Sequence, residues 1–249
     1  MARTAVPGRL SWQLARVVEL IEETPQTCSI VLEAPAWPGH RAGQHVDVRL
    51  TADDGYQAER SYSIASAPED EHLVLTVERL DDGEVSPYLA GELRPGDELE
   101  LRGPIGGYFV WEATLGGPLL LLAGGSGIVP LRSMLRHRGA VESAVPVRLL
   151  YSSRSLDEVI YRDELDRLAA DDEVDVRFTL TREQPEGWQG YRRRIDEALL
   201  REIVWPPDER PLVYVCGPTA FVEVAATALV QLGHEPGRIK TERFGPTGR

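Results

Sequence analysis

LLLLAGGSGIVP, residues 119–130, is the stretch from which the fold of the second half of this chain follows. Its first five residues are all apolar, as in a strand that is buried on both faces of a parallel sheet. The glycines after them let the backbone turn sharply and approach a ligand closely. The N-terminus of the next helix favours a phosphate there. An ordinary strand–helix turn has the same composition, and the full G-x-G-x-x-G spacing is missing, so the loop alone is a weak signal of a nucleotide site.

Helices and strands alternate from this stretch to the end of the chain. The second helix is expected to begin with a capping box formed by Ser155 and Glu158. Such alternation is typical of an α/β domain with a doubly wound parallel sheet. The predicted helices are Pro130–Arg138, Ser155–Ala170, Asp196–Glu202 and Thr219–Leu232, and the predicted strands are Leu119–Ala123, Val145–Tyr151, Val174–Leu180, Leu212–Cys216 and Ile239–Glu242.

The first half of the chain has a different pattern, with short alternating runs between turn-forming residues. Many short strands at this spacing predict a small antiparallel β-barrel or β-sandwich. A helix is expected near Ser86–Leu93, and the domain boundary within Trp111–Pro118, which gives domains of residues 1–113 and 114–249. The predicted strands are Trp12–Glu19, Thr27–Glu33, His45–Leu50, Ser61–Ser66 and Leu73–Glu78.

Composition limits the classes of function. The chain has 249 residues and a net charge of −13, most of it in Met1–Leu115, where 9 Arg face 20 Asp and Glu. An acidic surface disfavours nucleic acid, although the acids could serve solubility alone. Two Cys and five scattered His exclude a disulfide framework, an iron–sulfur cluster and a metal site. Without an apolar leader in residues 1–12 or a run long enough to span a membrane, we expect a cytoplasmic protein.

Two short motifs follow predicted parallel strands and point to a phosphate. Ser152-Ser153-Arg154 and Thr181-Arg182 place hydroxyls and guanidinium groups at the carboxyl ends of neighbouring strands. Arg binds phosphate in a bidentate fork, so these residues favour NADP(H) over NAD(H). The alternative is that both arginines are solvated loop charges.

Two further motifs carry candidate ligand contacts. In the run Arg60–Ser63, an Arg can neutralise a pyrophosphate, a Tyr can stack on a flat ring and a Ser can hydrogen-bond a ring nitrogen. The run Cys216–Thr219 lies where a strand meets a helix, and ligands bind outside the carboxyl ends of such strands. Cys216 could equally be a small buried hydrophobic residue.

Taken together, the motifs resemble the ferredoxin–NADP reductase superfamily, in its FAD-dependent electron-transfer branch without an iron–sulfur domain. The resemblance covers nearly the whole chain, and the pieces occur in the family's order. They are RSYS at 60–63, VERLDDGEVSPYL at 77–89, GDELELRGPIGGYF at 96–109, GGSGIVP at 124–130, YSSRSLDEVIYRDEL at 151–165, TREQ at 181–184, VCGPTAFV at 215–222 and ERFG at 242–245.

The resemblance implies a flavin-binding barrel followed by a nicotinamide-binding α/β domain, with Ser63 and Cys216 nearest the chemistry. NAD(H) stays an alternative cofactor, because GGSGIVP also occurs in family members that prefer NADH. The residues implied for FAD are Arg60, Ser61, Tyr62, Ser63, Val77, Glu78, Arg79, Glu84, Val85, Ser86, Ser126 and Phe244. The residues implied for NADP(H) are Gly125, Ser126, Gly127, Ile128, Ser153, Arg154, Thr181, Arg182, Cys216, Gly217 and Pro218.

The function implied by the resemblance is that of an NAD(P)H-dependent FAD oxidoreductase. NADPH would give a hydride to bound FAD, with the two rings held close together, and the cofactors would carry the chemistry. The electrons would then pass to a separate acceptor, such as a ferredoxin, an oxygenase or another redox partner, or to a small molecule. Two alternatives are a reductase of free flavin and a non-catalytic nucleotide-binding module that regulates a partner.

Overall fold

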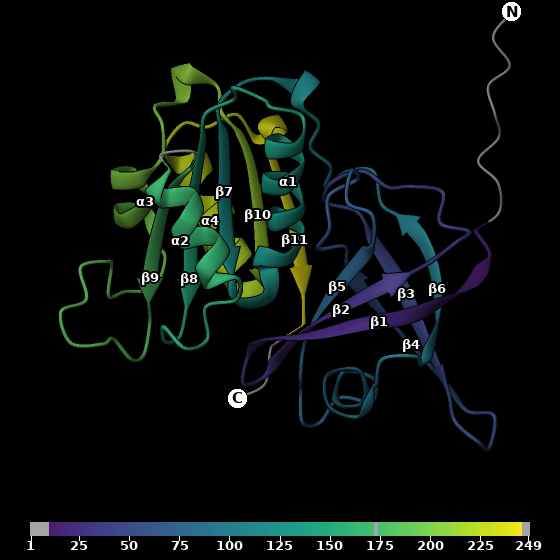
Figure 1. Ribbon diagram of the computed structural model, residues 1–249. Coiled ribbons are helices and arrows are strands. Elements are labelled where there is room, and N and C mark those ends of the chain that lie inside the picture. Colours follow the sequence, from purple (N-terminus) through teal and green to yellow (C-terminus); the bar gives the residue numbers. More distant parts are fainter. Residues whose placement is uncertain (1–9, 172–173, 246–249) are drawn as a thin grey trace, which may run out of the picture.

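The structure is a computed structural model that describes residues 10–171 and 174–245. It contains a six-stranded antiparallel sheet followed by a five-stranded parallel sheet with helices, as the sequence predicts (Figure 1). The expectation about an N-terminal leader falls partly on residues 1–9, which lie outside the described residues. None of the helices in the described ranges has the length and hydrophobicity that a membrane span requires.

The antiparallel sheet forms the N-terminal barrel, with the strand order β4-β3-β6-β1-β2-β5. A bridge between Ile64, just after β4, and Leu75 in β5 links the two edge strands. Alternate side chains from the strands point inward, and Ile30, Val46 and Leu101 are fully buried there. The strands are β1 (Trp12–Thr24), β2 (Thr27–Glu33), β3 (His45–Thr51), β4 (Gln57–Ser63), β5 (Leu73–Glu78) and β6 (Glu98–Ile105), with a short helix at Tyr88–Glu92.

The parallel sheet has the strand order β11-β10-β7-β8-β9. Every residue of Leu119–Ala123 in its central strand is fully buried, because helices cover both faces. Helices α1 and α2 pack on one face, and α3 and α4 on the other (Figure 1). The elements are β7 (Leu119–Gly124), α1 (Ile128–Ala140), β8 (Val147–Ser153), α2 (Arg162–Ala170), β9 (Asp175–Leu180), α3 (Glu197–Ile203), β10 (Leu212–Pro218), α4 (Thr219–Gln231) and β11 (Ile239–Phe244).

One helix prediction is wrong in its first part. Residues 155–160 are irregular, and α2 begins only after Tyr161, so Ser155 and Glu158 form no capping box. The segment is instead fixed by burial of Val159 and Ile160 and by a hydrogen bond from the Ile160 N–H to the Tyr151 hydroxyl oxygen. Tertiary packing therefore overrides the local capping signal. Helix α1 also begins two residues earlier than predicted and includes Gly139.

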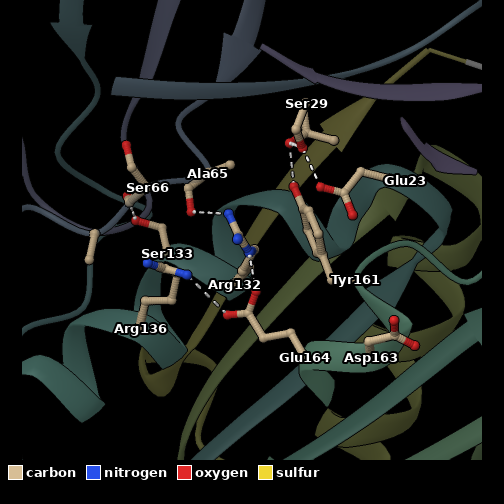
Figure 2. A network of polar contacts seen from close by, with 12 residues as sticks. Glu23, Ser29, Ala65, Ser66, Arg132, Ser133, Arg136, Tyr161, Asp163 and Glu164 are labelled. Carbon is tan, nitrogen blue, oxygen red and sulfur yellow. Dashed lines mark hydrogen bonds and ion pairs between the residues drawn. The ribbon is translucent and has the colours of Figure 1, made fainter. Parts of the chain in front are cut away.

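The seam between the two domains is lined with polar contacts from α1 and α2 (Figure 2). Arg136 in α1 binds both carboxylate oxygens of Asp70 in the barrel at 3.0 Å. The Ser133 hydroxyl donates to the Ser66 carbonyl at 2.6 Å, and Ser133 is fully buried. These contacts set the position of α1, and with it the glycine-rich loop, against the barrel.

Tyr161 adds a second connection across the seam (Figure 2). Its backbone is left-handed, with φ of 61°, and its buried hydroxyl donates to the Thr76 Oγ1 of β5 at 2.5 Å. The Arg132 guanidinium lies over its ring at 4.3 Å while the Nε of Arg132 donates to Glu164. A left-handed backbone at a non-glycine residue is unfavourable by itself, so the surrounding contacts must hold it.

The Asp70–Arg136 pair gives a test of the seam. Asp70→Asn removes the charge from a bidentate, partly buried pair, and should lower the free energy of unfolding by about 1 kcal/mol. Urea unfolding curves measure this difference. Asp53→Asn, which changes an exposed turn residue, is the control and should leave the curve unchanged. An equal effect of both substitutions would contradict the role of Asp70 in the seam.

Candidate functional site

A cavity of about 720 Å³ lies between the barrel and the parallel sheet. This volume is within the usual range for a small-molecule or cofactor site. Both domains contribute to its wall, so neither could form it alone. Of the residues predicted for FAD, those that line it are Arg60, Ser61, Tyr62, Ser63, Glu78, Glu84, Val85, Ser86, Ser126 and Phe244.

Strand β4 carries the first group of lining residues. Arg60 forms an ion pair with Glu84 at 2.5 Å, and the Tyr56 hydroxyl donates to the same carboxylate. An anionic ligand at Arg60 would have to compete with Glu84 for the guanidinium. Burial raises the pKa of Tyr62 to about 12, so its ring stays neutral and available for apolar contact. The Ser61 hydroxyl, in contrast, is directed to Asp47 at 2.7 Å.

Ser63 at the end of β4 meets Glu242 of β11 across the seam. The Ser63 hydroxyl donates to the Glu242 Oε1 at 3.5 Å, which is a long hydrogen bond. Burial raises the pKa of Glu242 to about 7, so this carboxyl group holds its proton in part at neutral pH. The pair therefore places a group that can gain or lose a proton inside the cavity.

Cys216 is the neighbour of Glu242 in the parallel sheet. It is buried and is not among the residues that line the cavity, so its thiol lies behind the wall. Burial raises the pKa of the Cys216 thiol well above its usual value, which keeps it neutral. Direct contact of Cys216 with a ligand would require the wall to move, and it stays a prediction.

The glycine-rich loop packs directly against the end of β10. A Cβ atom on Gly127 would lie 2.1 Å from the Cys216 carbonyl oxygen, so only glycine fits there. The next residue, Ile128, is fully buried in the core. Ser126 is therefore held at the cavity wall beside Glu78 of β5, and it lowers the pKa of that carboxyl group.

Two residues predicted to run along FAD have their side chains elsewhere. Val77 is fully buried in the barrel core. Arg79 is exposed and lies 3.2 Å from Asp81. Neither side chain lines the cavity, so any contact of these residues with a ligand there would have to come from the backbone.

The residues predicted to bind the 2′-phosphate lie together at the carboxyl ends of β8 and β9. The N–H of Thr181 donates to the Ser153 carbonyl, and the N–H of Arg182 donates to the Arg154 carbonyl, both at 2.9 Å. Arg182 is exposed, whereas Arg154 is partly buried and lies 3.8 Å from Glu158. Arg154 and Arg182 thus follow two adjacent strands at the carboxyl end of the sheet.

The remaining residues predicted for NADP(H) surround the glycine-rich loop. Gly125 has a positive φ of 55°, which suits glycine. Gly217 packs against Gly124, and a Cβ atom on Gly217 would lie 3.2 Å from the Gly124 Cα. Pro218 ends β10 beside Phe244 of β11. Gly125, Gly217 and Pro218 are not among the residues that line the cavity, and their contact with a dinucleotide stays a prediction.

Several lining residues were missed by sequence reasoning. Tyr108, Phe109, Glu242 and Arg243 lie within motifs that carried the family resemblance, so the motifs did signal their neighbourhood without marking them individually. Thr76 had no such signal, because a threonine inside a strand has the same pattern whether or not a cavity lies beside it.

Comparison with protein families assigns both halves of the chain. Residues 19–110 match the family described as the oxidoreductase FAD-binding domain, and residues 121–227 match the oxidoreductase NAD-binding domain. Among solved structures, the FAD/NAD-binding domain of nitric oxide dioxygenase from Vibrio cholerae has a TM-score of 0.84 and 26% identity, covering 94% of this chain and 99% of that one. A ferredoxin NADP+ reductase from Neisseria gonorrhoeae, with bound FAD and NADP, shares the fold with a TM-score of 0.81 and 23% identity, over 93% of this chain and 98% of that one.

Proteins with similar sequences show to which family of oxidoreductases the chain belongs. The glycine betaine monooxygenase reductase subunit of Pseudomonas aeruginosa is 31% identical over 94% of this chain, which spans 64% of that protein's length. Ferredoxin–NADP reductase B of Sorangium cellulosum is 36% identical over 82% of this chain and 84% of its own. With the barrel, the parallel sheet and both cofactor domains in place, the chain belongs to the ferredoxin–NADP reductase family of FAD-dependent oxidoreductases.

Proposed function

We propose that this chain takes a hydride from NADPH onto bound FAD and delivers the electrons to a separate acceptor protein. The observation that carries the proposal is the composite cavity, because the RSYS segment of the barrel and Ser126 of the glycine-rich loop line the same space. A flavin held by the first and a nicotinamide held by the second would therefore meet. Holding two reactants in contact supplies a large part of a rate enhancement.

The residues present fit FAD. The cavity is large enough for a flavin, and it offers Tyr62 for apolar contact and Arg60 for an anion. Arg60 and the backbone of Glu84–Ser86 would hold the phosphates, and Tyr62 and Phe244 would contact the ring. When bound, FAD supplies the ability to accept a hydride and release electrons one at a time.

Ser63 and Glu242 would hold and exchange a proton beside the flavin. Glu242 holds its proton in part at neutral pH, and the Ser63 hydroxyl, which lines the same cavity, can act as a donor and an acceptor beside it. Cys216 lies next to Glu242 as a neutral thiol, and we propose that it approaches the nicotinamide when the cavity wall moves. Ser63 thus orients the ring, and Glu242 sets the protonation state of its surroundings.

NADPH is preferred to NADH in this proposal. Ser153 and Thr181 with the two guanidinium groups of Arg154 and Arg182 form a polar edge suited to a 2′-phosphate. Gly125, Gly127 and the N-terminus of α1 would receive the pyrophosphate.

The acceptor is proposed from the relatives. The Pseudomonas protein is named as the reductase subunit of a monooxygenase, and a mycobacterial relative at 31% identity as the ferredoxin reductase component of another. The cysteines of this chain, Cys28 and Cys216, are too few to bind an iron–sulfur cluster. The electrons would therefore leave for a ferredoxin or an oxygenase component. A free-flavin reductase would instead purify without colour and bind flavin weakly.

Arg182→Ala tests the cofactor preference. Loss of the exposed guanidinium should raise the KM for NADPH about tenfold and leave the KM for NADH unchanged, because only NADPH carries the 2′-phosphate. The measurement is the anaerobic bleaching of the yellow FAD-loaded protein by each nucleotide. Arg167→Ala, on the exposed side of α2, is the control. An equal loss with both nucleotides would contradict the assignment.

Glu242→Gln tests the proton-holding group. The pKa of Glu242 is raised from 4.5 to about 7, so the folded protein keeps this proton longer than the unfolded chain does. Wild-type stability should therefore fall as pH rises from about 4.5 to about 7, and Glu242→Gln should show a smaller fall. Urea unfolding at pH 5 and pH 8 measures both. If the two proteins lose the same stability over this range, Glu242 is not the titrating group.

A further inference from the structure

Glu78 is a second partly buried glutamate of the cavity, at the end of β5. Thr76 precedes it by two residues and lines the same cavity, as expected from the alternation of side chains along a strand. Ser126 lies beside Glu78 from the other domain and lowers the pKa of its carboxyl group. The Glu78 Oε2 is buried and has no hydrogen-bond partner among the described residues.

This arrangement mirrors the Ser63–Glu242 pair. In that pair the serine comes from the barrel and the glutamate from the parallel sheet, whereas for Glu78 the serine comes from the glycine-rich loop. Each pair crosses the seam into the same cavity, but Glu78 has an acceptor oxygen left over. A buried acceptor without a partner costs free energy, which a donor on a ligand would offset.

The surroundings of Glu78 determine which donor fits. Burial raises the pKa of Glu78, while Ser126 and the positive charge of Arg154 lower it and the negative charge of Glu158 raises it. A phosphate would be repelled by the carboxylate when it is ionised. A neutral hydroxyl or amide N–H has no such penalty, so it is the class of donor that suits Oε2.

The position of Ser126 indicates which ligand supplies this donor. Ser126 belongs to the loop that joins β7 to α1 in the NAD-binding domain, so the space beside Glu78 lies where the loop faces the cavity. The phosphates are expected at the N-terminus of α1. The part of the dinucleotide that reaches past the loop into the cavity is then the nicotinamide and its ribose.

We propose that Glu78 is a binding residue for the nicotinamide half of the dinucleotide, and that its Oε2 accepts a hydrogen bond from a neutral hydroxyl or amide group there. The proposal rests on the proposed function, since it requires a nicotinamide nucleotide in the cavity. It assigns the Glu78 side chain to this ligand, although the sequence resemblance places Glu78 with FAD.

The test compares two ligands that share their adenosine half. NADP+ and 2′,5′-ADP are titrated by calorimetry into the FAD-loaded wild type, Glu78→Met, Glu78→Gln and the control Glu33→Gln, which changes an exposed glutamate on the neighbouring strand β2. Glu78→Met removes both acceptor oxygens and should weaken NADP+ about tenfold, the usual effect of losing a hydrogen bond to a charged group. Binding of 2′,5′-ADP should not change. Glu78→Gln keeps one carbonyl oxygen and should recover part of the loss.

Other outcomes of these titrations would overturn either the role of Glu78 or the proposed function. The proposal is overturned if Glu78→Met lowers the affinity for both ligands equally, or for neither. It is also overturned if the wild type binds NADP+ no more tightly than 2′,5′-ADP. If the variant instead loses FAD, measured by fluorescence of the released flavin, then the flavin supplies the donor and the proposal is again wrong. If the wild type binds neither nucleotide, the proposed function itself fails.

Discussion

The contacts that fix α1 against the barrel are the constraint on which the site depends. Arg136 binds Asp70 through both carboxylate oxygens, and Ser133 donates to a barrel carbonyl from a fully buried position. Because α1 begins where the glycine-rich loop ends, the same contacts place Ser126 at the cavity. A shift of α1 by one residue would separate the two halves of the wall.

Close backbone packing adds a second constraint inside the parallel sheet. Gly127 touches the Cys216 carbonyl so closely that no side chain fits between them. This contact fixes the loop to β10, whose neighbour β11 supplies Glu242. The loop, the thiol and the carboxyl group therefore lie on directly neighbouring elements, and the barrel brings Ser63 and Glu78 to them.

The two serine–glutamate pairs give this cavity titratable carboxyl groups, which a purely apolar flavin pocket would lack. Each pair joins the domains, and burial raises the pKa of both glutamates, so the protonation state of the site depends on how completely the seam excludes water. The hydroxyl of Tyr161 reaches Thr76 from the same side, which extends the polar lining along β5 (Figure 2). The packing of the two domains against each other therefore also affects the pKa values of the two glutamates in the cavity.

The sequence alone determined the two fold classes and the place of most segments that line the cavity. A run of five apolar residues at Leu119–Ala123 has few solutions other than a central strand, and the alternating runs before it fit a barrel. Only the tertiary structure decided that Ser155–Ile160 is not helical, that Val77 points into the barrel core, and that Glu242 meets Ser63. The physical reason is distance along the chain: Ser63 and Glu242 are 179 residues apart, and no local pattern specifies a contact that forms only when two finished domains dock.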